Sequence, residues 1–513
     1  MNGDTIMLMP DQALQHLCKK IRPEWKLAFF SSLVIGFLVH LYRLTNFLPN
    51  WDSIINFHTS QDTTFLGRCF LTYTCGISSY YDLPLVNGLL SLLYLSLGSV
   101  FITEIFQLHK KYVIVLFSGF FVTFPSVTST LAYNFTADGY FLAMLLSVLA
   151  VFLTLKYRWG FLPGALCLCI SYGSYQAYIT FAIMLIILWG IHSILFQSPE
   201  FKYFFRQMFR FLSMGTLGTA LYMLALQLIL RLKDLNLLSY QGISDASVSL
   251  SNIKKAVFLC LLKFKQFFLG DLRPSLYTFL QCLLLIAAIG SILILARKAK
   301  LHQRPLYLLT VLCLTMSIPF AATIIYFTSP TVDYHTLMCA AYSLLILPPL
   351  FLLENISSEK PAACLSSWFI TIVCGLSIFN NALIANIGYL YMNQSYEQTY
   401  GLVSHIAYRI HQYDFETPIT QIGVIGYLNP EYIMLDLPPE LTGITPSYLI
   451  DGQYGLREML NTLFDFELTD APDDIVIPFV HSPAYEQMDC WPASNSIVID
   501  GNVLYIKISD VEW

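Results

Sequence analysis

The chain has 513 residues, of which 56% are hydrophobic and 12% are charged, and its net charge is −5. An average soluble domain is about 25% charged, and a soluble fold of this length has too little interior to hide so much apolar surface. The composition therefore excludes a soluble protein and predicts an integral membrane protein. Lys and Arg form no basic patch of the kind that reads a base sequence, so we expect no nucleic-acid partner.

Eleven apolar segments follow one another along the chain, most of them about 20 residues long, the length of a membrane-spanning helix. They lie at residues 26–47, 84–106, 112–132, 137–155, 160–173, 176–196, 209–230, 277–296, 306–328, 336–353 and 364–386. They lack the alternating pattern of a barrel strand, and the first is too long for a signal peptide. The fifth is short and contains Pro163, so we expect it to be tilted or broken.

The Lys and Arg residues of the short loops predict the orientation of these segments. With the N-terminus in the cytoplasm, 16 of the 28 basic residues fall in cytoplasmic loops. The short outer loops at residues 132–136, 173–176 and 328–335 contain no Lys or Arg. Eleven spans then place the C-terminal region outside, whereas ten or twelve spans would move it to the cytoplasm.

Two outer segments are long, at residues 49–83 and 231–276. In the second, four lysines alternate with Phe and Leu at helical spacing, which predicts an amphipathic helix lying in the membrane interface. These are Lys254, Lys255, Lys263 and Lys265. Such a helix is either a plain surface anchor or a basic rim that attracts an anionic lipid headgroup.

The composition changes near residue 394. Residues 394–513 contain 18 Asp and Glu but only 3 Lys and Arg, whereas residues 1–393 carry a net charge of +10. Residues 395–412 suit a helix, residues 419–427 a strand, and residues 494–509 a hairpin that turns at Asp500–Gly501. We therefore predict an all-α polytopic membrane domain over residues 1–393, with about 11 transmembrane helices, and a small, acidic, soluble α/β domain over residues 394–513 on the outer side.

The polar stretch "NWDSIINFHTSQDTTFLGRCF", from Asn50 to Phe70, interrupts the apolar pattern directly after the first span. Carboxylates at membrane depth are costly and usually lie buried in protein or beside a water-filled cavity. The predicted topology collects the polar groups of several segments on the outer face. They are Trp51, Asp52, Asp62, Arg68, Asp138, Tyr175, Gln176 and His335. We expect these side chains to line a cavity at the outer leaflet.

The chemistry of such a cavity suits glycosyl transfer from a lipid phosphate. A carboxylate there accepts the proton of an attacking hydroxyl, and an arginine stabilises the departing phosphate. Because a phosphate ester leaves as a stabilised anion, one base with electrostatic help is enough. We assign Asp52 and Asp138 as catalytic and Arg68 as phosphate-binding. We assign the remaining polar and aromatic groups to the sugar or acceptor, namely Trp51, Asp62, Tyr175 and Gln176.

Structural alternatives stand beside these assignments. Asp52 and Asp138 are also placed to cap or flank helix starts, and Asp62 is also typical of a solvated loop acid. Arg68 alternatively pairs with a loop carboxylate, and His335 alternatively forms a hydrogen bond at a helix interface. Tyr175 and Gln176 alternatively satisfy one another between helices.

The first-loop Asp, "LGRCF", "FTADGYFLAMLLSVLAVFL" and "SYGSYQAYITFAIMLI" together resemble the bacterial serotype-converting glucosyltransferases that modify O-antigen, over about residues 25–400. The resemblance implies a GT-C-like fold in the bacterial inner membrane, with the active site on the periplasmic side. It also implies inverting transfer of glucose from undecaprenyl-phosphate glucose to an O-antigen or related glycan. A donor-synthesising glycosyltransferase and a flippase would be functional partners. Asp52 matches the first-loop acid, Arg68 the Gly-Arg residue, and Asp138 the acid opening the fourth span.

Two positions depart from the pattern of this family. Cys69 stands where an aromatic residue often follows the Gly-Arg, and His335 stands where we expect an arginine. The donor phosphate is therefore assigned to Arg68, His335, Arg273 or Lys265. The sequence has no cysteine or histidine cluster with metal-ligand spacing, so we expect neither a metal nor another cofactor.

Two other functions remain open at the level of sequence. A polysaccharide or lipid-sugar transporter should show repeat symmetry and broken helices near the membrane midplane, and the sequence shows neither. An O-antigen polymerase or ligase should have a large, arginine-rich outer loop. The segment at residues 231–276 contains only Arg231 and Arg273.

Overall fold

The computed structural model describes residues 9–238, 250–270, 275–356, 361–412, 418–428, 441–445, 447–450 and 453–510. Within these residues, ten helical segments are long and apolar enough to cross a membrane, and the helix Phe161–Ser174 is a shorter apolar one. The prediction of an all-α polytopic membrane protein is therefore confirmed.

The chain begins with helix α1 (Pro10–Lys20) and then forms a helical bundle. The bundle consists of α2 (Pro23–Thr45), α4 (Pro84–Phe106), α5 (Lys111–Thr123), α6 (Pro125–Ala132), α7 (Asn134–Lys156), α8 (Phe161–Ser174), α9 (Ile179–Phe196), α10 (Phe201–Leu232), α11 (Leu250–Leu269), α12 (Leu276–Lys298), α13 (Pro305–Ala322), α14 (Leu347–Asn355) and α15 (Pro361–His411). A short helix α3 (Leu71–Cys75) and six 3-10 helices lie between them: η1 (Ser53–Ile55), η2 (Thr64–Leu66), η3 (Gln176–Tyr178), η4 (Leu301–Gln303), η5 (Ile324–Phe327) and η6 (Thr336–Ile346).

Every predicted span contains an observed helix, and the differences have local causes. The third span divides into α5 and α6 at Pro125, whose ring cannot continue the hydrogen-bond pattern of α5. The fifth span, α8, is short but unbroken, because Pro163 lies in its first turn, where backbone N–H groups need no helical partner. The tenth span begins as the 3-10 helix η6 before it becomes α14.

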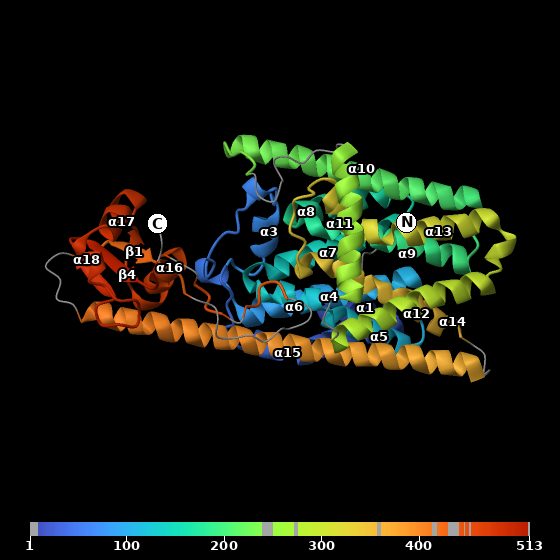
Figure 1. Ribbon diagram of the computed structural model, residues 1–513. Coiled ribbons are helices and arrows are strands. Elements are labelled where there is room, and N and C mark those ends of the chain that lie inside the picture. Colours follow the sequence, from blue (N-terminus) through green and yellow to red (C-terminus); the bar gives the residue numbers. More distant parts are fainter. Residues whose placement is uncertain are drawn as a thin grey trace.

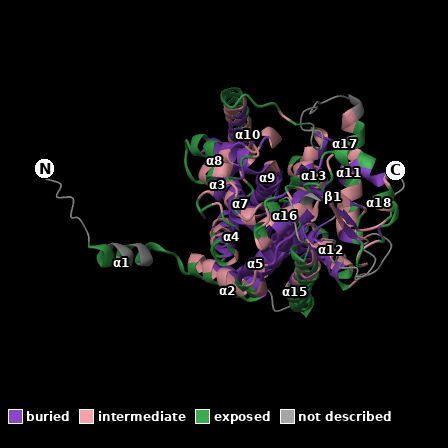
Figure 2. Ribbon diagram, turned by 90° about the vertical axis from the view of Figure 1, so that its left-hand side faces the viewer, coloured by how far each residue is buried: buried purple, intermediate pink, exposed green. Residues whose placement is uncertain are grey.

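The bundle has a closely packed centre and an apolar periphery. The segments formed by α5 with α6 and by η6 with α14 are almost completely buried, whereas most of α10, α13 and α15 faces outward. Figure 2 shows buried residues around α5, α7 and α9, and exposed residues on the outer sides of α10 and α15. An apolar exposed belt of this kind is the surface that a lipid bilayer covers.

Helix α15 connects the bundle to the C-terminal domain. It has 51 residues, which at 1.5 Å per residue is about 75 Å, whereas the apolar core of a membrane is about 30 Å thick. Its second half therefore extends beyond the bundle to the C-terminal domain, as Figure 1 shows. The last predicted span and the predicted helix at residues 395–412 form this one helix, and the predicted boundary at 393/394 lies inside it.

The C-terminal domain is a small α/β unit. Its sheet has the strand order β2-β1-β4-β3, formed by β1 (Gln421–Ile425), β2 (Thr469–Asp470), β3 (Ile497–Asp500) and β4 (Val503–Lys507). Strand β1 runs parallel to β2 and β4, and β3 pairs antiparallel with β4, which confirms the predicted hairpin. Its turn consists of Gly501 and Asn502, one position later than predicted, because Asp500 still pairs with Val503. The domain also contains α16 (Gln453–Phe464), α17 (Asp473–Val480) and α18 (Pro483–Glu486). Leu504 and Ile506 of β4 join the apolar cluster that contains α16, and Val503 and Tyr505 join the cluster that contains α17.

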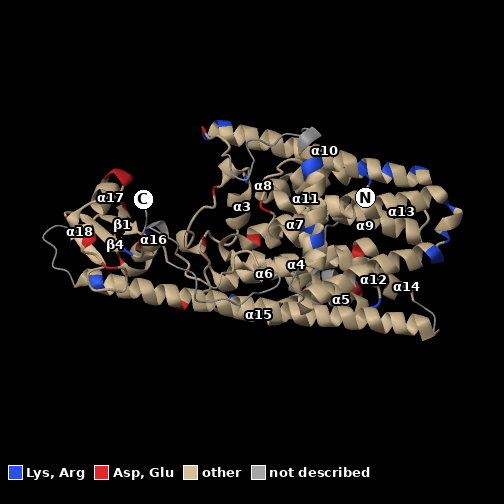
Figure 3. Ribbon diagram, viewed as in Figure 1, with Lys and Arg blue, Asp and Glu red and all other residues tan. Residues whose placement is uncertain are grey.

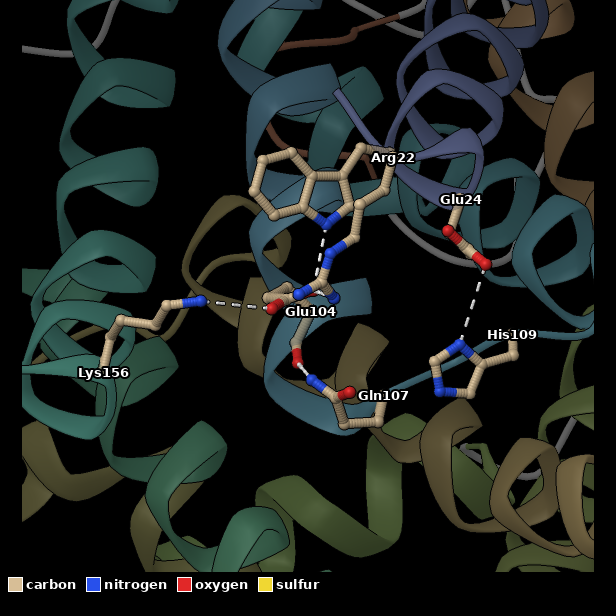
Figure 4. A network of polar contacts seen from close by, with 7 residues as sticks. Arg22, Glu24, Glu104, Gln107, His109 and Lys156 are labelled. Carbon is tan, nitrogen blue, oxygen red and sulfur yellow. Dashed lines mark hydrogen bonds and ion pairs between the residues drawn. The ribbon is translucent and has the colours of Figure 1, made fainter. Parts of the chain in front are cut away.

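The two ends of the bundle differ in charge. Figure 3 shows many Lys and Arg residues at the end farthest from the C-terminal domain. At that end the buried Glu104 of α4 accepts hydrogen bonds from Arg22 at 2.9 Å and from Trp25 at 3.0 Å, and it pairs with Lys156 at 3.5 Å (Figure 4). The carboxylate thus ties α4 to the chain at the start of α2 and to the end of α7. The positive-inside rule predicts that this end is the cytoplasmic one, in line with the orientation expected when α8 is counted as a span.

Helix α11 runs across the direction of α10 and α15, as expected for a helix that lies along a membrane surface (Figure 1). Three of its four lysines, Lys254, Lys255 and Lys265, are exposed. Lys263 is half-buried and interacts electrostatically with Cys339 of η6. The apolar residues of α11 pack on η5, α12 and α13.

Candidate functional site

The segment between α2 and α4 lies at the end of the bundle that faces the C-terminal domain (Figure 1). Asp52 precedes the 3-10 helix η1, but its side chain forms no capping hydrogen bond. The backbone N–H of Ser53 is satisfied instead by Asn50, whose side-chain oxygen accepts it at 2.8 Å. The Asp52 carboxylate therefore does not cap η1. Its side chain is half-buried and is available for another role.

A sharp turn at Gly67 places Arg68. Gly67 has φ +75°, and a Cβ there would lie 2.7 Å from the side-chain nitrogen of Gln176 and 3.0 Å from the hydroxyl of Tyr222. Both neighbours hold the turn, since Gln176 donates to the carbonyl of Leu66 at 3.0 Å and Tyr222 donates to that of Gly67 at 3.0 Å. The Gly-Arg pair is thus a structural unit in which glycine allows the turn that directs arginine.

Arg68 meets an acid and two aromatic rings. It interacts electrostatically with Asp52, and its guanidinium donates to the hydroxyl of Tyr140 at 3.0 Å. Its guanidinium carbon lies 5.2 Å from the ring centre of Tyr175, which stacks on Tyr140 with ring centres 4.3 Å apart. Residues from the first outer loop, α7 and the α8–η3 junction therefore converge on one place.

Two features of its surroundings shift the pKa of the Asp52 carboxyl in opposite directions. Burial raises its pKa above the ordinary value, and the positive charge of Arg68 acts in the opposite direction. Because burial is the larger effect, the carboxylate holds a proton more readily than a solvated aspartate does. Because its pKa is raised, such a carboxylate is a better acceptor for the proton of a hydroxyl group than an ordinary surface carboxylate is.

Asp138 is placed differently from Asp52. It lies in the second turn of α7, so it is not a cap, and it is completely buried. Its neighbours are Cys75, at the end of α3, and Ser78, which follows it. Glycine at position 139 allows α3 to pack closely on α7, since a Cβ there would lie only 2.6 Å from the sulfur of Cys75. In this arrangement Asp138 lies beneath α3, on the same side of the protein as Asp52 but without access to solvent.

Asp62 and Gln176, both assigned to the sugar or acceptor, make defined structural contacts. Asp62 pairs with Lys233 at the end of α10 and accepts a hydrogen bond from Thr64 at 2.7 Å. This ion pair lowers the pKa of the Asp62 carboxyl and is more than one-third exposed. Gln176 supports the Gly67 turn, as described above, so both residues hold the loop in place.

The remaining predicted residues surround the loop at different depths. His335 lies 3.5 Å from the exposed carboxylate of Asp333, directly before η6. Trp51 is partly exposed and packs edge-on against Tyr133, with ring centres 6.4 Å apart. Lys265 is exposed on α11, and Arg273 lies outside the described residues.

Two hollows are lined by neither Asp52 nor Arg68. The first is beside Glu104 and the second is in the C-terminal domain near Leu456. The expected cavity at the outer leaflet is not one of these two. Tyr140 and Tyr175 are instead packed ring on ring beneath Arg68. Among the described residues, no group of three or more His, Cys, Asp or Glu side chains is arranged to hold a metal ion.

Sequence reasoning missed several residues of this region. Tyr140 lies two positions after Asp138 in a segment that reads as plain membrane helix, and Tyr222 lies inside a predicted span. A second buried cluster joins Arg43 of α2, which donates to the carbonyl of Leu131 at 2.8 Å, with Asp82, which accepts from Asn134. Arg43 and Asp82 interact electrostatically, and their positions at the edges of predicted spans were the available signal.

One family model, described as glucosyl transferase GtrII, matches residues 41–353, which include the site and most of the bundle. The chain belongs to this family. GtrII membership identifies it as a glucosyltransferase, in agreement with the resemblance to serotype-converting enzymes. The match covers Asp52, Arg68 and the tyrosine stack but ends before α15 and the C-terminal domain. No curated protein and no solved structure matches this GtrII chain.

Proposed function

We propose that this GtrII glucosyltransferase moves glucose from a polyprenyl-phosphate donor to a hydroxyl group of O-antigen or a related surface glycan. The reaction takes place at the outer face of the bacterial inner membrane. The donor is made by a separate glycosyltransferase and turned over by a flippase, since a sugar phosphate headgroup does not cross the apolar core unaided.

The proposed step is a single displacement with inversion. Asp52 accepts the proton of the acceptor hydroxyl, and the oxygen attacks the anomeric carbon of glucose from the side opposite the phosphate. A bond forms between that carbon and the acceptor oxygen, and the bond to the phosphate oxygen breaks. The electron pair stays on the phosphate, where Arg68 stabilises the added negative charge through a charge-assisted contact.

One observation carries this proposal: Arg68 is held against the stacked rings of Tyr140 and Tyr175, at a place where its charge acts on the carboxyl of Asp52, 16 positions earlier in the same loop. A base within the electrostatic reach of a guanidinium supplies both charges that the step needs, and aromatic faces suit the sugar. The exposed lysines of α11 also support an anionic lipid donor, because a basic helix at the membrane surface attracts its phosphate.

The test replaces Asp52 with asparagine, which keeps the shape of the side chain but removes the base. Purified protein in vesicles is given polyprenyl-phosphate [14C]glucose and O-antigen glycan, and transfer is followed as label in the glycan. Removing a general base costs about 10²–10⁴-fold in rate, so we expect Asp52→Asn to lose at least about 10²-fold. Asp474→Asn, in an exposed position of α17, is the matched control. Transfer near the wild-type rate in Asp52→Asn excludes Asp52 as the base.

The acceptor is tested by mass spectrometry of the surface polysaccharide from cells with and without the protein. We expect one added hexose for each repeat unit in cells that contain it. A change of chain length without added hexose indicates a polymerase or ligase instead, and lost export indicates a transporter.

A further inference from the structure

The C-terminal domain lies outside the family match, yet one of its apolar clusters contains a residue of the first outer loop. Ile54 is only 2% exposed and lies two positions after Asp52. All other buried members of this cluster come from residue 403 or later, that is, from the outer half of α15 and from the C-terminal domain. Among them are Val403, Ile406, Leu449, Ile450, Leu456, Met459 and Leu460. The loop thus inserts one side chain into the core of a domain about 350 residues later in the chain.

The path from Ile54 to Asp52 is short and rigid. Ser53 donates its backbone N–H to Asn50, and Asn56 donates its backbone N–H to Ser53 at 3.0 Å. The side chain of Asn56 also donates to the backbone carbonyl of Asp52 at 2.8 Å. These hydrogen bonds join residues 50–56 in one turn, so a displacement of Ile54 also moves the backbone that carries the Asp52 side chain.

A segment that enters the C-terminal domain contacts the bundle next to the same loop. Thr442 accepts a hydrogen bond at 3.0 Å from the backbone N–H of Thr336, the first residue of η6. Gly443 has φ +86°, and a Cβ there would lie 2.5 Å from the ring of Tyr133, against which Trp51 packs. Leu449 and Ile450, a few residues on, are in the cluster with Ile54. The loop is therefore held between this segment and the core of the domain.

We propose that Ile54 is a positioning residue through which the C-terminal domain sets the place of Asp52 in the glucosyltransferase site. This inference rests on the proposed role of Asp52. A displacement of about 1 Å at a reacting group costs about 10²-fold in rate, so loss of the anchor acts on the chemical step rather than on donor binding.

The experiment measures kcat and KM for the lipid donor with the full-length protein. Ile54→Ala is expected to lower kcat by about 10²-fold with little change in KM, and Ile54→Val to restore most of it. Ile55→Ala is the matched control, because Ile55 is the next residue but is 38% exposed. It is expected to keep the wild-type kcat.

A second pair of variants tests the same coupling from the other side. Gly443→Ala brings a methyl group against the ring of Tyr133 without touching Ile54 or Asp52, and it is expected to lower kcat in the same way. Gly501→Ala is the matched control. It also places alanine at a positive φ, of +61°, but in the β3–β4 turn, where no atom lies within 4 Å of the added Cβ. It is expected to leave kcat unchanged.

The outcomes separate this inference from the proposed function. Wild-type protein that moves no glucose from the lipid donor refutes the proposed function. Wild-type protein that does so, with folded Ile54→Ala and Gly443→Ala at the same kcat, refutes the positioning role alone. A loss in Ile54→Ala that appears only as a higher KM also refutes it. Circular dichroism and resistance to proteolysis report whether each variant is folded.

Discussion

Replacing Gly67 with alanine should displace Arg68 and slow glucosyl transfer. Gly67 has φ +75°, a conformation that costs an L-residue about 1–2 kcal/mol. The new methyl group would lie 2.7 Å from the side-chain nitrogen of Gln176 and 3.0 Å from the hydroxyl of Tyr222. Each of these groups donates a hydrogen bond to the turn, so moving either one away loses about 1 kcal/mol more.

The sum is about 2–4 kcal/mol, which the turn relieves by moving the backbone that carries Arg68. We expect the transfer rate to fall about 10- to 100-fold, since the guanidinium leaves its place against Tyr140 and Tyr175. The assay is the vesicle reaction with labelled lipid donor, together with thermal unfolding of the detergent-solubilised protein. Gly215→Ala in α10 is the control, because no atom lies within 4 Å of a Cβ there. Folded Gly67→Ala with the wild-type transfer rate would show that the turn does not place a catalytically important arginine.

Three further predictions follow from the same contacts. The proposed base acts when ionised, and burial raises the pKa of Asp52, so transfer should fall on acidification already above about pH 4. Arg68→Gln removes a positive charge that lowers this pKa, so it should move the acid limb of the pH–rate profile to higher pH. A limb that does not move would contradict the assignment of Asp52 as the base. Lys233→Ala removes a partly exposed ion pair with Asp62, so it should change the free energy of unfolding by no more than about 1 kcal/mol and leave transfer nearly unchanged. A large loss of transfer would show that this ion pair matters for the reaction and not only for the loop. Glu104→Gln weakens the charged contacts with Arg22 and Lys156 at the other end of the bundle. Thermal unfolding should show a free energy of unfolding lower by about 1–3 kcal/mol, while the folded protein keeps its kcat. A specific loss of kcat would contradict a purely structural role.

The sequence was sufficient for features that depend on local pattern. Spans follow from the length of apolar segments, and the β3–β4 hairpin follows from alternating residues around Asp500–Gly501. The length of α15 was not predicted, because the polar residues after 386 suggested a new element although neither proline nor a turn interrupts the helix there. The presence of Asp52 and Arg68 at one end of the bundle followed from topology alone.

Contacts between distant segments were beyond sequence reasoning. Nothing local distinguishes Ile54, which is buried in another domain, from the exposed Ile55 beside it. The stack of Tyr140 on Tyr175 joins two helices whose separation and rotation are set by packing. The burial of Asp138 depends likewise on the close approach of α3 at Gly139. Such contacts arise from the tertiary fold, and the hydrophobic periodicity of the sequence does not predict them.

The arrangement of these anchors indicates how the two charges of the site are kept in register. A connecting segment on a protein surface, such as the one between α2 and α4, is held in place by contacts with its surroundings. Gln176 and Tyr222 fix the Arg68 turn to the bundle, whereas Ile54 fixes the Asp52 turn to the C-terminal domain. The separation of the proposed base from the guanidinium therefore depends on how the domain sits on the bundle. Since α15 is one continuous helix that belongs to both, the proposed positioning role of Ile54 makes the outer half of α15 part of what sets that separation.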